Sequence, residues 1–324
     1  MKTFNEINEI ISDEISKLDW TKEPRGLYSP IQYVLSLGGK RVRPVLSLMA
    51  CNLFTDDIAP SIPLALGIEV FHNFTLLHDD IMDHADIRRG QATVHKKWND
   101  NTAILSGDAM QIAAYQLVAQ VPEKYLKSIL GLFSATAIEI CEGQQYDVDF
   151  ESQSMVTGDD YLEMIRLKTA VLLGCALKCG AITGGANETD AQLLYDFGIN
   201  IGLAFQLKDD LLDVYGNELT FGKKIGGDIL CNKKTYLLIH AFKLAEGADR
   251  TELESYLNDH LLSPEAKISG VTSVYNKLGV RKICEDKMSF FYEKAIANLE
   301  KVSVAGNKKQ ELRKLAEKLM SRID

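Results

Sequence analysis

Proline is nearly absent from the interior of this 324-residue chain, since five of its seven prolines lie in the first 63 residues and none lies between Pro122 and Pro264. Proline breaks helices, so this long stretch is free to be helical. Alternating runs of Val, Ile and Thr between tight turns, the signal of strands, are also missing. We therefore predict an all-α protein of about ten or more helices. Breaks are predicted near residues 38–39, 56–63, 88–90, 122, 157–160, 184–185, 215–228 and 263–264.

Linkers, low-complexity tracts and internal repeats are lacking as well. The length of the chain would allow two domains, but no segment rich in Ser, Pro and Gly divides it. With 46% apolar and 25% charged residues, the composition is that of an ordinary globular protein with a large core. We predict a single domain over residues 1–324.

Long apolar runs are missing too. No segment approaches the ~20 apolar residues of a membrane helix, and the acidic, amphipathic N-terminus MKTFNEINEIISDEIS is not expected to be a signal peptide. The six cysteines are scattered, and Cys175 and Cys179 have no histidine or further cysteine nearby to complete a zinc site. We predict free thiols in a reducing, cytoplasmic compartment.

Positive charge is in deficit, because the formal net charge is −9. Binding to nucleic acid requires a basic surface, so no nucleic-acid partner is expected. Each short basic cluster in the chain is, taken alone, typical of a surface patch or a helix end. These clusters are Lys40, Arg41 and Arg43, then Arg88 and Arg89, then Lys168, and then Lys223 and Lys224.

Carboxylates are concentrated in two motifs of the form DDxxD. The first comprises Asp79, Asp80 and Asp83, and the second comprises Asp209, Asp210 and Asp213. Apolar residues flank both motifs, so neither helix is a fully exposed polar surface. Carboxylates four residues apart share a helix face and repel each other, so we expect a cation between them.

A magnesium site would explain the acidic motifs together with the basic clusters. Mg²⁺ prefers carboxylate oxygens, keeps several waters and commonly bridges carboxylates to substrate phosphates. Two acidic helix faces turned toward each other could hold such ions around a diphosphate, while Lys and Arg neutralise the remaining charge. Diphosphate would then be a good leaving group.

Helical periodicity extends each motif into a stripe. The stripes are His72, Thr75, Asp79 and Asp83 on one helix, and Gly202, Gln206, Asp209 and Asp213 on the other. A cavity with metal ions at one end and an apolar tube at the other suits a hydrophobic chain with a diphosphate head. On spacing alone, close helix packing at Gly202 and a hydrogen-bonded core histidine at His72 are the commoner explanations.

In their order along the chain, these segments resemble the motifs of the trans-isoprenyl diphosphate synthases, or polyprenyl synthetases. The resemblance runs from about Leu35 to Ala241, and its segments are GGKRVRP, LLHDDIMDHADIRRGQATVH, ILSGDA, IRLKTA, FQLKDDLLDVYG and FGKKIGGDILCNKKTYLL. It implies the all-helical isoprenoid synthase fold around a central cavity. It also implies a Mg²⁺-dependent prenyltransferase that joins isopentenyl diphosphate head-to-tail to dimethylallyl, geranyl or farnesyl diphosphate.

The resemblance further implies roles for individual residues. The metal ligands would be Asp79, Asp80, Asp83, Asp209, Asp210 and Asp213, which hold several Mg²⁺ ions. The allylic diphosphate would be bound directly by Arg88, Lys168 and Lys223 or Lys224. Isopentenyl diphosphate would be held by Lys40, Arg43, His72 and Arg89, with help from Arg41. The catalytic residues at the allylic group would be Lys168, with Thr169 and Gln206, whose oxygens face the developing cation in the family.

Product length depends, in the family, on bulk just before the first DDxxD. The fifth and fourth residues before Asp79 are Phe74 and Thr75, and one large residue resembles synthases with C15 or C20 products. On an ideal helix Phe74 points away from the Asp79 stripe, so a kink or Phe71 could instead form the floor of the cavity, which blocks the growing tail of the product. We predict a C15 to C20 product, with a longer-chain synthase as an alternative.

Other functions fit the sequence less well. A class I terpene cyclase has a second motif of the Asn-Ser-Glu kind and needs no second diphosphate pocket. A metal-buffering helical bundle leaves the basic clusters without a role. A non-catalytic partner subunit of a prenyl synthase is a further alternative, against which two intact acidic motifs argue. The resemblance alone implies a homodimer.

Overall fold

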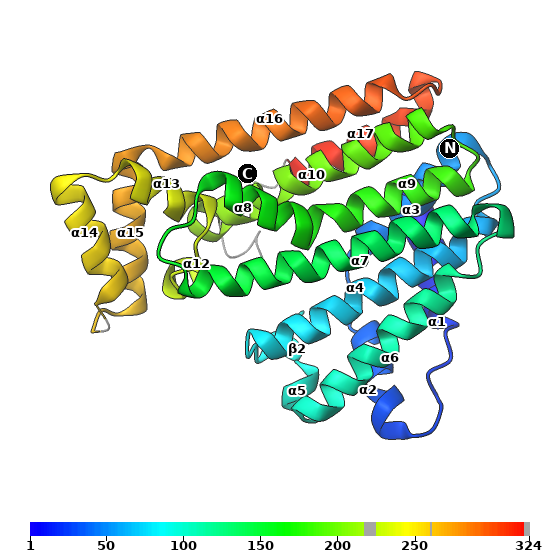
Figure 1. Ribbon diagram of the computed structural model, residues 1–324, viewed down its shortest axis with the longest axis horizontal. Helices are drawn as coiled ribbons and strands as arrows, with labels where there is room; N and C mark the ends of the chain where they lie inside the picture. Colours follow the sequence, from blue (N-terminus) through cyan, green and yellow to red (C-terminus); the bar gives the residue numbers. More distant parts are fainter. Residues whose placement is uncertain (217–224, 260, 321–324) are drawn as a thin grey trace. The chain divides into compact units, whose positions relative to one another are not determined.

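The computed structural model describes residues 1–216, 225–259 and 261–320, which are almost entirely helical (Figure 1). The predicted all-α class is confirmed, because the described ranges contain only one pair of two-residue strands. The helices are α1 Phe4–Ser16, α2 Arg25–Ser36, α3 Val42–Phe54, η1 Ala59–Ser61, α4 Ile62–Met82, α5 Val94–Lys97, α6 Asp100–Val118, α7 Glu123–Ser152, α8 Gly158–Ile165, η2 Arg166–Ala170, α9 Val171–Thr183, α10 Glu188–Tyr215, α12 Gly227–Leu230, α13 Tyr236–Leu244, α14 Gly247–Asn258, α15 Pro264–Leu278, α16 Val280–Lys301 and α17 Gly306–Met320.

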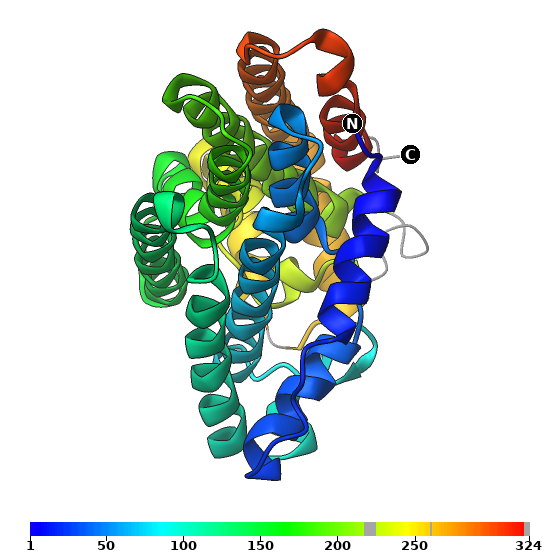
Figure 2. The same cartoon turned by 90° about the vertical axis from the view of Figure 1, so that its right-hand side faces the viewer.

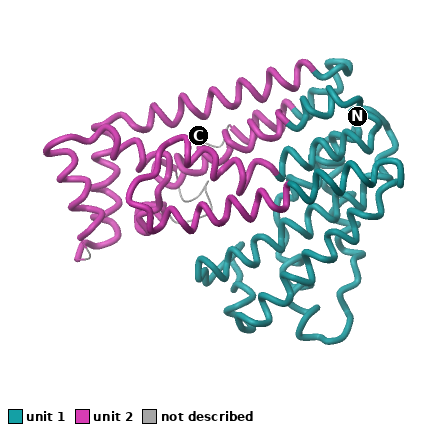
Figure 3. Tube along the Cα trace, viewed as in Figure 1, with its two compact units in different colours: residues 1–135, 172–195, 302–312 teal, residues 136–171, 196–301, 313–324 magenta. Residues whose placement is uncertain are grey.

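The chain forms two compact units, which Figure 3 distinguishes by colour. Unit 1 comprises residues 1–135, 172–195 and 302–312, and unit 2 comprises residues 136–171, 196–301 and 313–324. Each unit is built from three separate stretches of chain and is described by itself. The single domain over residues 1–324 stays a prediction.

The helix boundaries follow the helix-breaking and helix-capping residues of the sequence. Within the described residues, the predicted breaks lie at observed helix ends or between two helices; for example, α7 begins directly after Pro122 and α15 begins with Pro264. The predicted break over residues 215–228 lies partly outside the described residues. Side-chain caps accompany several of these starts, since the hydroxyls of Thr157 and Ser263 accept backbone N–H groups in the first turns of α8 and α15. Sequence reasoning missed η2, which is a π-helix.

A short hairpin follows α4 and was not expected from the sequence. Strands β1 (Ile87–Arg88) and β2 (Gln91–Ala92) pair antiparallel, with Arg88 opposite Gln91. The two turn residues, Arg89 and Gly90, both have positive φ, at 53° and 75°, which is typical of a two-residue type I′ turn. The hydroxyl of Tyr33 in α2 donates to the carbonyl of Ala92 at 2.8 Å, so the hairpin is fixed to α2.

Helix α4 forms the centre of unit 1. Its residues from Leu64 to Leu77 are mostly buried, and it packs along α6 and against α3, with α1 on α3 and α4 (Figures 1 and 2). Two pairs of helices approach closely at glycines: a Cβ on Gly107 of α6 would stand 2.1 Å from His78 Nε2, and one on Gly180 of α9 would stand 2.0 Å from the Ser47 carbonyl oxygen of α3. The contact at Gly180 needs a residue without a side chain because it is with backbone, whereas a larger residue at position 107 would displace the His78 ring.

Unit 2 has its own apolar core. Buried residues of α8, of α10 beyond residue 195, and of α13, α15 and α16 meet in one cluster that includes Tyr161, Leu207 and Val271. Helices α14 and α15 form an antiparallel pair at one end of this unit (Figure 1). In the described part of the chain, no helix has both the length and the apolar character needed to cross a membrane.

Replacing Gly180 by Ala should destabilise the protein by roughly 1–3 kcal/mol, because the new methyl group collides with backbone of α3. The matched control is Gly131→Ala, also helical and in unit 1, where a Cβ meets nothing within 4 Å. This control should be neutral or stabilising by up to about 1 kcal/mol. Urea unfolding of both variants tests this expectation, and equal stabilities would contradict the close contact.

Candidate active site

Helix α4 positions three sets of side chains in unit 1. Because residues three, four and seven apart share a helix face, each set points to a different side. The sets are Glu69, Asn73 and Asp80; His72, Thr75 and Asp79; and Phe71, Phe74 and His78. The first set contacts arginines of the GGKRVRP segment and of the hairpin. In the third set, Phe71 packs against Phe133 of α7, which in turn contacts Tyr115 of α6.

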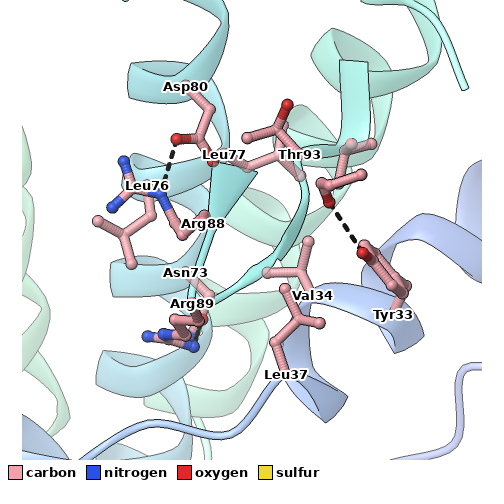
Figure 4. Close-up of a pocket in the computed structure, with 12 residues that line it drawn as sticks. Tyr33, Val34, Leu37, Asn73, Leu76, Leu77, Asp80, Arg88, Arg89 and Thr93 are labelled. Carbon is pink, nitrogen blue, oxygen red and sulfur yellow. Dashed lines mark hydrogen bonds and ion pairs between the residues drawn. The ribbon is translucent and has the colours of Figure 1, made fainter. Parts of the chain in front are cut away.

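Arg88 pairs with the first acidic motif. Its Nε donates to Asp80 Oδ1 at 2.7 Å (Figure 4), and its Nη2 lies 3.4 Å from Asp79 Oδ2. Burial raises the pKa of Asp80 to about 6, and Arg88 opposes this shift. Asp83 caps the end of α4 and is exposed. Arg88, which was predicted to bind diphosphate, thus pairs with the neighbouring carboxylates Asp79 and Asp80, and a cation between Asp79 and Asp83 stays a prediction.

Arg43 and His72 form a basic corner on the other side of α4. Arg43 Nη1 lies 3.1 Å from His72 Nε2. Burial, and next the charge of Arg43, hold the pKa of His72 well below its ordinary value, so the imidazole is neutral and can accept from Arg43. Burial lowers the pKa of Arg43 to about 10, which leaves it charged at neutral pH. Arg43 Nε is buried and has no hydrogen-bond partner among the described residues, so this corner favours an anion.

The loop before α3 contacts Arg89 of the hairpin at the same corner. Gly38 and Gly39 have φ values of 75° and 137°, which favour glycine. Arg89 Nη1 donates to the carbonyl of Gly38, and a Cβ on Gly39 would stand only 3.0 Å from Arg89 Cζ. Lys40, on the same loop, is exposed. Four residues predicted to hold isopentenyl diphosphate, namely Lys40, Arg43, His72 and Arg89, therefore lie on adjoining elements of unit 1.

Arg41 is placed differently from the other predicted ligands of isopentenyl diphosphate. Its side chain is buried, its Nη1 pairs with the carboxylate of Glu69, and its Nη2 donates to the carbonyl of Leu35 at 2.7 Å. Its backbone has a left-handed φ of 48° at the start of α3. Arg41 thus anchors the GGKRVRP loop to α4, and its help in binding substrate stays a prediction.

The predicted chain-length residues lie on the aromatic side of α4. Phe71 is 1% exposed, and its ring contacts Phe74 at 5.3 Å and Phe133 of α7 at 5.1 Å between centroids. Phe74 also contacts His78. Thr75 belongs to the other stripe, and its hydroxyl donates to the His72 carbonyl at 2.8 Å. Phe71 and Phe74 therefore form one continuous aromatic wall in unit 1.

The three aspartates of the second motif differ in their surroundings within unit 2. Asp210 is buried and accepts a hydrogen bond from the hydroxyl of Tyr161 at 2.6 Å. Burial and the charge of Asp228 raise the pKa of Asp210 to about 8. Asp213 is also buried, and its Oδ2 accepts from the Asp228 N–H at 3.1 Å in the first turn of α12. Asp209 is more accessible than these two. The metal roles of all three stay predictions.

Lys168 lies in the π-helix η2, which often marks functional sites. Its Nζ is 2.7 Å from Asp147 Oδ2 of α7, and Lys233 Nζ is 3.8 Å from the same oxygen. Burial alone would raise the pKa of Asp147, but Lys233 and Lys168 lower it below its ordinary value. The next residue, Thr169, donates its hydroxyl toward Gln206 Oε1 at 3.5 Å. The predicted allylic-site residues of unit 2 thus adjoin one another.

Lys223 and Lys224 lie outside the described residues. Sequence reasoning also missed several residues that hold the predicted ones in place. Glu69 and Asn73 could have been found, because a charged or amide residue within an apolar helical run such as EVFHNF indicates a buried polar contact. No local signal identified the remaining residues, because their partners are distant in sequence. These residues are Asp147, Tyr161 and Lys233.

The donor chemistry suits a hard divalent cation. The motifs offer carboxylate oxygens only, which Mg²⁺ and Ca²⁺ prefer. In the described part of the chain, no three His, Cys, Asp or Glu side chains converge into a ready ligand set. Mg²⁺ uses one or two carboxylates with waters and substrate phosphates, so these motifs fit it without such a cage.

Comparisons with known proteins identify the family of the chain. The family model of polyprenyl synthetases matches residues 24–277. A geranylgeranyl diphosphate synthase of Methanosarcina mazei is 42% identical over 223 residues, which are 68% of each chain. The crystal structure of a geranylgeranyl pyrophosphate synthase is 44% identical, with a TM-score of 0.94 over 100% of both chains. That of the Corynebacterium glutamicum enzyme, complexed with isoprenyl diphosphate and magnesium, is 25% identical, with a TM-score of 0.88 over 99% of this chain and 100% of that chain.

The chain belongs to the polyprenyl synthetase family. The isoprenoid synthase fold predicted from the sequence is confirmed. The chain is a prenyltransferase that condenses isopentenyl diphosphate with an allylic diphosphate to a short-chain prenyl diphosphate, as predicted. These relatives are named as synthases, which favours an enzyme over the non-catalytic partner subunit.

Asp147→Asn should lower the melting temperature by an amount equivalent to roughly 1–3 kcal/mol, because it removes a carboxylate that neutralises both Lys168 and Lys233. Added pyrophosphate should restore stability more in this variant than in the wild type, since a bound anion stabilises the folded state. The control is Asp149→Asn on the same helix, whose exposed carboxylate accepts a hydrogen bond from Gln145. Equal thermal shifts in the two variants would contradict the role of Asp147.

Proposed function

We propose that this enzyme is a Mg²⁺-dependent synthase of C15 to C20 trans-prenyl diphosphates that works as a homodimer. The observation that carries the substrate assignment is the basic corner of unit 1. There, neutral His72 lies against Arg43, and the charges of Arg89, Arg88 and Arg41 act on the same imidazole. Such a concentration of cations is stabilised by a bound polyanion. The diphosphate of isopentenyl diphosphate is the anion that family membership supplies.

Isopentenyl diphosphate is held, in this proposal, by Lys40, Arg43, His72 and Arg89. Arg43 offers its unpaired, buried Nε–H, and His72 fixes the guanidinium plane by accepting from Nη1. A planar guanidinium suits two phosphate oxygens at once. Arg41 acts through Glu69 by holding the loop that carries Lys40.

The allylic diphosphate is held by both acidic motifs through Mg²⁺ and directly by Arg88, Lys168 and Lys223 or Lys224. Asp79, Asp83 and Asp209 are the main metal ligands in this proposal, because Asp80 pairs closely with Arg88 and Asp210 pairs with Tyr161. When bound, Mg²⁺ supplies positive charge that stabilises the departing pyrophosphate. Arg88 would turn from Asp80 toward the diphosphate as the metal ions take over the carboxylates.

The chemistry needs no side-chain nucleophile. Cations placed around the departing diphosphate stabilise its developing charge, which is typically the largest catalytic contribution. The oxygens of Thr169 and Gln206, which are 3.5 Å apart, face the developing allylic cation in this proposal. The double bond of isopentenyl diphosphate attacks that cation, and the released pyrophosphate removes the proton.

The two carboxylates at the start of the second motif should respond differently to amidation. Asp209→Asn should lower kcat by about 100-fold or more, because it removes a metal ligand. Asp210→Asn should cost less than about tenfold, because the amide can still accept from the buried Tyr161 hydroxyl. The assay combines purified enzyme, Mg²⁺, labelled isopentenyl diphosphate and C5, C10 or C15 allylic diphosphate, with products resolved by chain length.

In the same assay, chelation and Asp79→Ala should abolish elongation. Equal losses in Asp209→Asn and Asp210→Asn would contradict the proposed division of roles in the second motif. No elongation by the folded wild type with any primer would overturn the proposed function itself.

Phe71→Ala with Phe74→Ala should shift the products to longer chains, because these rings form one aromatic wall on α4. Product chromatography of the double variant measures the shift. Leu53→Ala, a buried position of α3 outside that wall, controls for general loss of core packing, which is about 2–5 kcal/mol for such a change. If the double variant and the control both keep the wild-type product, neither phenylalanine forms the floor.

A further inference from the structure

The amide of Asn73 connects two of the charged groups around the basic corner. Asn73 lies on α4 and is fully buried. Its Nδ2 donates to the carbonyl and to the Oε1 of Glu69, both at 2.8 Å, and its Oδ1 accepts from Arg89 Nη1 at 3.3 Å. Both ends of the amide are therefore used, and Arg89 is joined to Glu69 only through a neutral group.

The hairpin presents its two arginines to α4 in different ways. Arg88 lies beside Asp80 and Arg89 lies beside Asn73, one above the other along the helix (Figure 4). Asn73 and Asp80 are seven residues apart, which is about two helical turns. Both arginines can face α4 because Arg89 has a positive φ in the turn. The structure thus offers a carboxylate to one arginine and an amide to its neighbour.

This difference matters for charge. A carboxylate partner neutralises an arginine, whereas an amide oxygen orients it and leaves the positive charge in place. In the described ranges no carboxylate lies within ion-pair distance of Arg89. Among the acids of α4, Glu69 has the largest electrostatic effect on Arg89, and its Oε1 already receives Arg41 and the Asn73 amide. Asn73 therefore keeps Arg89 apart from Glu69.

We propose that Asn73 is a positioning residue in the binding of isopentenyl diphosphate. Asn73 orients Arg89 toward the diphosphate and prevents Arg89 from pairing with Glu69. This inference rests on the proposed role of Arg89. The family motifs assign no role to Asn73, although it lies between the predicted ligand His72 and the chain-length residue Phe74.

Two substitutions separate the two parts of the proposal. Asn73→Ser keeps a donor to the Glu69 carbonyl, because a helical serine hydroxyl bonds four residues back, but its side chain is too short to reach Arg89. Asn73→Asp keeps an acceptor for Arg89 and adds a negative charge. Both should raise the KM and the Kd for isopentenyl diphosphate by about five- to twentyfold, which is less than the full contribution of a hydrogen bond to a charged group, because Asn73 does not itself contact the substrate.

The KM for the allylic diphosphate and kcat at saturating isopentenyl diphosphate should stay within about twofold of the wild type, because Arg88 keeps its own partner. The matched control is Asn52→Ser on α3. Asn52 is equally buried and also uses both ends of its amide, with Lys2 N–H and the Thr55 carbonyl. This control should lose stability without any change in either KM.

Calorimetric titration with isopentenyl diphosphate alone, without an allylic substrate, completes the test. An unchanged Kd in Asn73→Ser, or an equal rise in both KM values, would overturn the role of Asn73. The proposed function is tested separately, because it requires that the wild type elongates an allylic primer. A wild type that elongates while Asn73→Ser binds isopentenyl diphosphate normally would remove this inference and leave the proposed function standing.

Discussion

Repulsion between like charges held close together is the constraint on which the rest of this structure depends. Two unit charges about 4 Å apart interact by about 4 kcal/mol near a protein surface, so clustered aspartates or lysines destabilise an empty site. The fold places an opposite charge within two of the described clusters: Arg88 faces Asp79 and Asp80, and Asp147 faces Lys168 and Lys233. Substrate and metal binding must then exchange partners rather than simply fill an empty pocket.

The three aspartates of the DDxxD pattern therefore have different partners in the two acidic motifs. In the first motif the second aspartate is paired with Arg88 of the hairpin. In the second motif that position is paired with a buried phenol, and the third aspartate holds the start of α12. One motif thus has a carboxylate paired with an arginine side chain, whereas the other has two carboxylates engaged in contacts within unit 2.

Much of the fold could be predicted because it depends on local features. The absence of proline between Pro122 and Pro264 predicted a helical interior, and glycines and prolines marked the helix ends that the structure shows. Family motifs led to the residues around the site. The π-helix at Lys168, the burial of Arg41 on Glu69 and the pairing of Tyr161 with Asp210 were not predictable. Each depends on a neighbour distant in sequence or on a backbone detail that no residue pattern specifies.

The hairpin between α4 and α5 has a consequence for how the chain can evolve. Surface turns usually accept insertions and deletions. Here two adjacent arginines serve two different partners along α4 because a two-residue turn sets their directions. One added residue would change the register and turn a side chain to the opposite face. The length of this exposed segment is therefore as constrained as the identity of any buried residue.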